Sequence, residues 1–295
     1  MTASQIKSDD LLTFDKVGAV VIRNLLSAEM LDGLRGGIGH LIDTADDYSD
    51  YYDSGDLTTT SANETKRVKK SGQTLTRQNG WIISAPLRRF LHQSPLAEAA
   101  ATLMGSREIR IYEDLMIYKA AGSEQPTPWH QDDPQWPLVG HQMCSAWFCL
   151  DPVDSQTGAL RFAAGSHKGP RYQPYVAPSR AADFDADKQY FEGGPQPDVE
   201  ANPQRFPVVC YDTNPGDVVF FSPRSLHAAI GSAPTYPRRT FSIRFLGDDV
   251  RWEPKKTVMY EWLANIKLHA GDKAVDPHFP LLWPRPAQEP VPIAG

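Results

Sequence analysis

The pattern of apolar and polar positions predicts a strand and helices in the first third of the chain. Residues 19–23 form a short run rich in β-branched side chains, and the apolar residues of 30–38 follow at helical spacing. Ser27 stands just before them, where a helix N-cap is expected. The pattern predicts a second helix over 86–103.

From residue 107 onward, the chain consists of short runs rich in Ile, Val, Phe, Tyr and Trp, which Gly and Pro separate. Short strands with turn residues between them are typical of a sandwich or a barrel. Segment 168–206 interrupts them, is rich in Pro, Asp and Gly, and is much longer than an ordinary connection. A helix is expected at 258–269, before a Pro-rich tail. The predicted strands are 108–119, 143–150, 158–163, 207–211, 217–222, 226–230 and 239–246.

The chain is expected to form one domain over 1–295, because 295 residues with 41% hydrophobic side chains can still fold around one core. Residues 1–105 would give strand and helical support, and 106–250 would form the β core. Segment 168–206 is expected to act as a lid, since loops of this kind often close over a substrate. Residues 251–295 would add a C-terminal helix and a tail.

Charge and cysteine content exclude several kinds of partner. With 36 acidic against 30 basic residues, the net charge of −6 gives no electrostatic surface for nucleic acid or for an anionic membrane. Three cysteines are an odd number without paired spacing, which indicates reduced thiols. No apolar leader or membrane-length apolar run is present in the sequence, so a cytoplasmic protein is expected. The oligomeric state has no signal in the sequence.

Candidate metal ligands occur in the segment WHQDDPQWP. In an extended chain His130 and Asp132 share one face, and one more histidine would complete a set of two imidazoles and one carboxylate. Such a set leaves three coordination positions open, as non-haem Fe(II) oxygenases require. The pair alone is a common chance pattern. The third ligand could be His141, His167 or His227.

A candidate anion site follows in RRTFSIRF. Its alternation places Arg238, Thr240, Ser242 and Arg244 on one polar face, with Arg239 on the other. A guanidinium fixed inside a barrel suits bidentate binding of a carboxylate.

Taken together, five segments resemble the phytanoyl-CoA dioxygenase group of Fe(II)/2-oxoglutarate-dependent oxygenases, in family order over most of 14–247. The resemblance implies a mainly β fold with flanking helices, a double-stranded β-helix also called a jelly roll or cupin-like barrel. The segments are FDKVGAVVIRNLL, WHQDDPQWP, CSAWFCLDPVDSQTGALRFAAGSHKG, PGDVVFFSPRSLHAA and PRRTFSIRF.

Carried over residue by residue, the resemblance implies that His130, Asp132 and His227 bind Fe(II). It also implies that Arg238 pairs with the distal carboxylate of 2-oxoglutarate, and that Trp147 lines the pocket of this co-substrate. The carboxylate of Asp132 argues against the halogenases of this superfamily, in which a small residue stands at that position.

The implied reaction consumes 2-oxoglutarate and O2, releases succinate and CO2, and hydroxylates or otherwise oxidises an unactivated C–H bond of a small, mostly apolar metabolite. Two alternatives are a non-redox metal-dependent enzyme of the cupin type and a catalytically silent barrel that binds a small molecule. Candidate substrate-lining residues near the motifs are Gln78, Trp81, Tyr118, Trp129 and Trp136.

Overall fold

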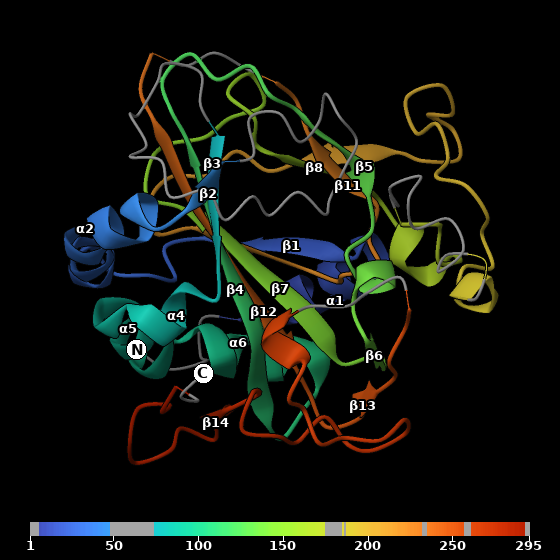
Figure 1. The fold of residues 1–295 in the computed structure, drawn as a ribbon. Helices are drawn as coiled ribbons and strands as arrows, with labels where there is room; N and C mark the ends of the chain where they lie inside the picture. The colour runs from blue at the N-terminus through green and yellow to red at the C-terminus, as the bar shows by residue number, and fades with distance from the viewer. Residues whose placement is uncertain are drawn as a thin grey trace.

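Two antiparallel sheets facing one another form the body of the protein, and helices cover the outer side of the larger sheet (Figure 1). The structure is a computed structural model. It describes residues 6–47, 74–174, 185, 187–231, 235–256 and 261–292.

The larger sheet has the strand order β1-β10-β7-β12-β4-β3-β2, with β14 paired to β4. All seven strands predicted from residue 107 onward are present, within two residues at each end. The strands of the larger sheet are β1 (Ala19–Ile22), β2 (Asp46–Asp47), β3 (Thr74–Gln78), β4 (Ile109–Lys119), β7 (Met143–Cys149), β10 (Val218–Phe221), β12 (Arg238–Leu246) and β14 (Leu281–Trp283).

The smaller sheet has the order β5-β11-β8-β9, and a short ladder joins β6 to β13. The strands are β5 (Thr127–His130), β8 (Leu160–Ala163), β9 (Val208–Cys210), β11 (His227–Ala229), β6 (Leu138–Val139) and β13 (Arg251–Trp252).

The two faces of β12 separate the main core from the interior of the barrel. Phe241, Ile243 and Phe245 are fully buried against the helices, in a core that includes apolar side chains from the helical segments 31–42, 87–91 and 96–103. The alternate polar side chains of β12 point to the opposite face, as a strand period of two requires. On that inner side, Trp147 of the large sheet and Phe162 of the small sheet pack in a second core. The candidate chemistry therefore lies between the sheets.

The helices confirm the N-terminal prediction in part. Ser27 caps α2, and its hydroxyl accepts a hydrogen bond from the Met30 amide at 3.3 Å. The single helix predicted over 86–103 is instead two helices, because Pro95 cannot continue the first one. The helices are α1 (Ser8–Val17), α2 (Ala28–Asp43), α4 (Gly80–Ile83), α5 (Ala85–Gln93) and α6 (Leu96–Met104).

The helix predicted at 258–269 is not observed in the described part of that segment. Residues 257–260 lie outside the description, and Glu261–Leu263 form a single 3-10 turn. Leu263 is buried in a cluster with Phe279. The apolar residues whose spacing suggested a helix therefore serve to pack this single turn against the rest of the protein. The helix expected within 251–295 is corrected accordingly.

Segment 168–206 connects β8 to β9, which pair with one another. Three of its described aromatic residues are buried: Phe191, and Tyr172 and Phe206, which pack in a cluster with Val199. Two aromatic residues of the segment that would suit a lid, at 175 and 184, lie outside the described residues.

In the described part of the chain, helices reach neither the length nor the apolar character that crossing a membrane needs.

Candidate metal centre

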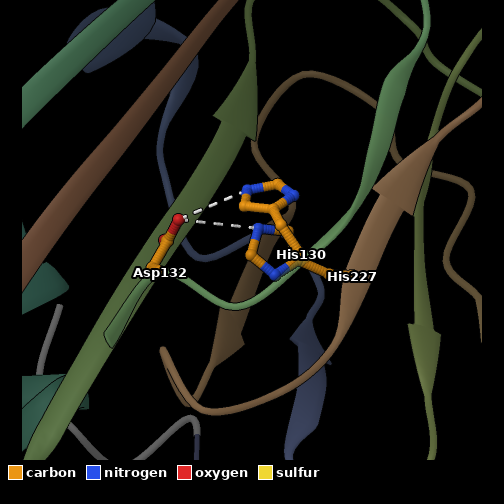
Figure 2. Close-up of side chains that lie close together, drawn as sticks. All are labelled: His130, Asp132 and His227. Atoms are coloured by element: carbon orange, nitrogen blue, oxygen red, sulfur yellow. Dashed lines mark ion pairs between the residues drawn. The ribbon is translucent and has the colours of Figure 1, made fainter. Parts of the chain in front are cut away.

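The side chains of two histidines and one aspartate lie close together where β5 ends and β11 begins, in the smaller sheet (Figure 2). His130 ends β5 and His227 begins β11, and the two residues are direct partners in the ladder between these strands. The Asp132 Oδ1 atom lies 3.4 Å from His130 Nε2 and 3.9 Å from His227 Nε2. The three ligand atoms all lie within 4.8 Å of one another, a spacing that one metal ion can bridge.

Backbone carbonyls fix how the two imidazole rings point. His130 Nδ1 lies 2.8 Å from the Pro128 carbonyl oxygen, and His227 Nδ1 lies 3.0 Å from that of Ser225. A carbonyl oxygen can only accept a hydrogen bond, so Nδ1 carries the hydrogen and the lone pair of the ring lies on Nε2, on the side of Asp132. This arrangement of donors fits a metal held by two imidazoles and one carboxylate, with further coordination positions open.

The local geometry of Asp132 differs from the extended one expected. Strand β5 ends at His130, and Asp132 has φ −78° and ψ −43°, in the helical region, where it precedes a short 3-10 helix at Asp133–Gln135. Its amide donates to the Pro223 carbonyl at 2.9 Å, and this bond ties the turn to the segment before His227. A turn, not a shared strand face, brings the carboxylate to the histidines.

The charges of the ligands suit a divalent cation at neutral pH. Burial alone would raise the pKa of Asp132, but Arg244 and the two histidines hold it below its usual value. Burial, helped by nearby His130, lowers the pKa of His227 to about 4. An ionised carboxylate and a neutral imidazole are the forms that bind metal.

A buried pair of cations lies at one end of the inner face of β12. Arg238 is the direct ladder partner of Lys119 on β4. Burial, and then the charge of Arg238, lowers the pKa of Lys119 to about 7. Burial likewise lowers the pKa of Arg238, whose Nε has no hydrogen-bond partner among the described residues. None of the described carboxylates forms an ion pair with either cation, so a bound anion would compensate their charge.

The position of the Arg238 guanidinium depends on a glycine. Its Nη1 donates to the carbonyl oxygens of Thr157 and Gly158, both at 2.8 Å. Gly158 has φ +93°, and a Cβ at this position would overlap the guanidinium.

The other end of the same face carries a cation between two carboxylates. Arg244 pairs with Glu113 through Nη1, and its Nη2 lies 3.6 Å from Asp132 Oδ1. Gln78 donates its amide hydrogen to the other oxygen of Glu113. Burial raises the pKa of Glu113 in spite of these two donors. The Trp136 ring lies 5.5 Å from Arg244 Cζ, so Gln78 and Trp136 both belong to the surroundings of the site.

Trp147 also lies on the inner face. It is the ladder partner of Ser242, between the Arg238 end and the Arg244 end, and only 5% of its surface is exposed.

Three expected substrate-lining residues lie elsewhere. Trp81 is buried in the core beneath the helices. Neighbouring residues of a strand point to opposite faces. Tyr118 therefore points away from the face that carries Lys119 and packs on the helix side. In the same way Trp129 points away from His130 and packs under segment 168–206. The structure corrects the expected placement of these three side chains.

The structure also separates the three candidates for the third ligand. The side chain of His141 is exposed, and His167 Nε2 lies 3.0 Å from the backbone oxygen of Asp15, so His227 is the histidine that joins the site.

Sequence reasoning missed Lys119 and Glu113. Both occupy alternate positions of the predicted strand 108–119 whose side chains point inward. Pairing that strand with 239–246 would have placed them opposite Arg238 and Arg244.

Comparisons with known proteins agree with this fold. The phytanoyl-CoA dioxygenase (PhyH) profile matches residues 14–240, whereas no curated protein sequence matches the chain. The carbocyclase SnoK from nogalamycin biosynthesis, a non-haem α-ketoglutarate-dependent enzyme, superposes with a TM-score of 0.70 at 20% identity over 96% of this chain and 98% of its own.

Two further structures contain relevant ligands. The epimerase SnoN in complex with Fe3+, α-ketoglutarate and nogalamycin RO has a TM-score of 0.68 at 18% identity, over 93% of this chain and 97% of its own. EctD from S. alaskensis with 2-oxoglutarate and 5-hydroxyectoine has a TM-score of 0.62 at 19% identity, over 92% and 86%.

The fold, the triad and the family match define a 2-oxoglutarate-dependent non-haem iron oxygenase with a jelly-roll core. The chain belongs to the phytanoyl-CoA dioxygenase family.

Proposed function

We propose that this enzyme uses 2-oxoglutarate and O2 to oxidise an unactivated C–H bond of a small metabolite, with release of succinate and CO2. The observation that carries the proposal is the distribution of charge along β12. A site of three metal ligands lies at one end, and two buried cations without a carboxylate partner among the described residues lie at the other. The first feature would bind the metal, and the second would bind a carboxylate of the co-substrate.

His130, Asp132 and His227 would hold Fe(II), which when bound supplies the activation of O2. The chain's own residues prepare that site. The carbonyls of Pro128 and Ser225 orient the imidazoles, and the burial of Asp132 and His227 limits the access of water to these two ligands.

Arg238 and Lys119 would bind the distal carboxylate of 2-oxoglutarate. The Arg238 guanidinium is already held in place by two backbone carbonyls, so little side-chain freedom is lost when the anion binds. Trp147, between the two ends of the strand face, would line the pocket along the body of the co-substrate.

The substrate would lie on the Arg244 side of the metal. Gln78, Glu113 and Arg244 make that side polar and charged, which favours a metabolite that combines an apolar body with a hydrogen-bonding group. Trp81, Tyr118 and Trp129, whose aromatic rings suggested a mostly apolar ligand, lie away from the site and do not support a wholly apolar one.

The test is anaerobic addition of Fe(II) and then of 2-oxoglutarate to the purified protein. Bidentate chelation of the metal by the co-substrate gives a weak visible charge-transfer band, which we expect in the wild type and not in His227→Ala. A non-redox metal enzyme or a silent binding barrel would give no such band. The substrate can then be sought as the metabolite that increases conversion of 2-oxoglutarate to succinate.

We also place the protein in the cytoplasm. Its three cysteines are free in the structure, and Cys144 and Cys149 are buried thiols whose pKa burial raises, as suits a reducing compartment.

A further inference from the structure

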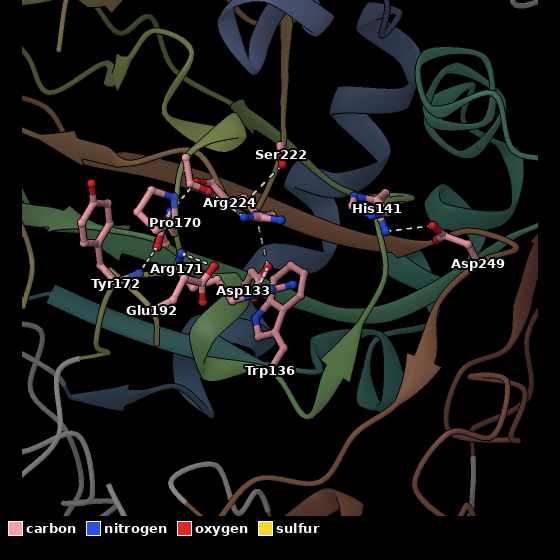
Figure 3. A network of polar contacts seen from close by, with 12 residues as sticks. Asp133, Trp136, His141, Pro170, Arg171, Tyr172, Glu192, Ser222, Arg224 and Asp249 are labelled. Carbon is pink, nitrogen blue, oxygen red and sulfur yellow. Dashed lines mark hydrogen bonds and ion pairs between the residues drawn. The ribbon is translucent and has the colours of Figure 1, made fainter. Parts of the chain in front are cut away.

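Gln131, which separates His130 from Asp132, and Asp133, which follows Asp132, belong to a second network of polar contacts; Figure 3 shows Asp133 beside Arg171 and Arg224. Gln131 and Asp133 are both fully buried. Their contacts are with the beginning of segment 168–206 and with the turn that leads into His227, so this network touches every part of the chain that carries a ligand.

Gln131 joins two of these parts. Its Nε2 donates to the carbonyl oxygens of Arg224 at 2.7 Å and Pro170 at 3.1 Å, and its Oε1 accepts from the Tyr172 amide at 2.8 Å. Three of the four hydrogen bonds that an amide side chain can make are therefore used to hold backbone groups.

Asp133 supplies the charge in the same network. Arg171 Nε donates to both of its carboxylate oxygens, at 2.8 and 3.0 Å, and Arg224 Nε lies 3.9 Å from Oδ2. Arg224 in turn donates through Nη2 to the Gly169 carbonyl at 2.7 Å. A fully buried carboxylate thus connects residues 169–172, which we call the stem, with the turn at 222–226.

The same turn is joined to the ligand segment through the backbone. The amides of Asp132 and Asp133 both donate to the Pro223 carbonyl, at 2.9 and 3.1 Å. Since His227 Nδ1 is oriented by Ser225 in this turn, displacing the turn would displace His227 relative to Asp132.

We propose that Asp133 is a positioning residue for the metal ligands, and that through Arg171 and Arg224 it couples the stem of segment 168–206 to the metal centre. The proposal rests on the proposed metal site at His130, Asp132 and His227. Because coupling is reciprocal, metal binding should stabilise the stem, and loosening the stem should weaken metal binding.

The experiment compares Mn(II) affinity in the wild type, Asp133→Asn and Arg171→Gln by equilibrium titration. Loss of a group that orients metal ligands typically costs about 10–100-fold in metal affinity, and we expect a loss of that size in both variants. The double variant should lose little more than either single one, since both remove the same contact. Wild-type Mn(II) affinity in the folded variants would overturn the proposal.

Asp217→Asn is the matched control. Asp217 is also buried and pairs with an arginine, Arg23, at 2.8 Å, but it joins the start of β10 to the end of β1. This variant should lose thermal stability and keep its Mn(II) affinity. If it lost affinity as Asp133→Asn does, the effect would be general destabilisation and positioning would be rejected.

Hydrogen exchange on the unmodified protein tests the coupling where a variant fails to fold. We expect Mn(II) to slow amide exchange both at 222–227 and in the stem, including the Tyr172 amide that Gln131 holds. Protection at 222–227 without protection of the stem would overturn the coupling and leave the metal centre intact. If the wild type bound no Mn(II), the proposed metal site would fail, and this proposal with it.

Discussion

Arg238 and Arg244 lie on the same face of the same strand, and both are largely buried, yet their surroundings are opposite in charge. Across the ladder, Arg238 faces Lys119, whereas Arg244 faces Glu113 and also approaches Asp132. The first pair of side chains leaves positive charge uncompensated within the described protein, and the second is compensated by carboxylates. A buried arginine therefore marks a ligand site only where its neighbours do not already neutralise it.

The largest expected effect tests whether the metal lies at the Arg244 end. Asp132→Ala and His227→Ala each remove one ligand, so metal affinity should fall by more than the roughly 10–100-fold typical of losing a group behind the ligands. Equilibrium titration with Mn(II) measures this, and product formation should be abolished. A variant that keeps wild-type metal affinity, or more than a small fraction of activity, would disprove the ligand assignment.

The Arg244 end of β12, where carboxylates compensate the positive charge, should matter most for stability. Arg244→Met leaves the buried Glu113 carboxylate without its cation, which should cost about 3–5 kcal/mol in the free energy of unfolding of the metal-free protein. Adding Glu113→Gln to Arg244→Met should recover part of that loss, as denaturant unfolding would show. If the two changes were simply additive, the compensation inferred for this end would be absent.

The uncompensated end should matter most for the co-substrate. Arg238→Met should weaken 2-oxoglutarate binding by about 2–5 kcal/mol, or roughly 30- to several-thousand-fold, while metal affinity is retained. Calorimetric titration of 2-oxoglutarate into the Mn(II)-loaded protein measures the change.

Arg239→Met is the control for that titration. Arg239 lies on the opposite face, where it pairs with Asp151, so this variant should bind 2-oxoglutarate as the wild type does. Greater sensitivity at Arg239 than at Arg238 would contradict the register of β12.

The sequence predicted the strands well because the β core is made of short apolar runs with clear turn residues between them. It also placed Arg238 and Arg239 on opposite faces, since alternation in a strand depends on local geometry alone. The candidate ligands followed from residue types and order. For the iron-binding residues the inference also needed the family resemblance, because His141 and His167 were open alternatives on spacing alone.

What the sequence could not predict depends on which strands pair. Lys119 and Glu113 acquire their meaning from facing Arg238 and Arg244, more than a hundred residues away. The aromatic residues show the same limit: Trp136 and Trp129 come from one short segment, but Trp136 lies behind Arg244 and Trp129 lies beneath segment 168–206. Composition alone does not distinguish these two environments.

The smallest expected effect is a pH dependence of co-substrate binding at the uncompensated end. Burial and the charge of Arg238 lower the pKa of Lys119 to about 7, so in the free protein this amine loses its proton as the pH rises above that value. A bound carboxylate favours the charged amine, so binding requires proton uptake above about pH 7. The affinity for 2-oxoglutarate should therefore be constant below about pH 7 and fall above it, by at most about tenfold per pH unit.

The ionisation of Lys119 gives the stability of the fold a pH dependence of the opposite sign to that of co-substrate affinity, so the two effects can be distinguished. Its pKa is lower in the folded than in the unfolded chain, so the unfolded state binds more protons between about pH 7 and the ordinary lysine pKa of 10.5. Stability should accordingly rise with pH over that window while co-substrate affinity falls. Lys119→Met should bind 2-oxoglutarate more weakly at pH 7 and show no such slope, whereas an unchanged slope in this variant would assign the pH dependence to another group.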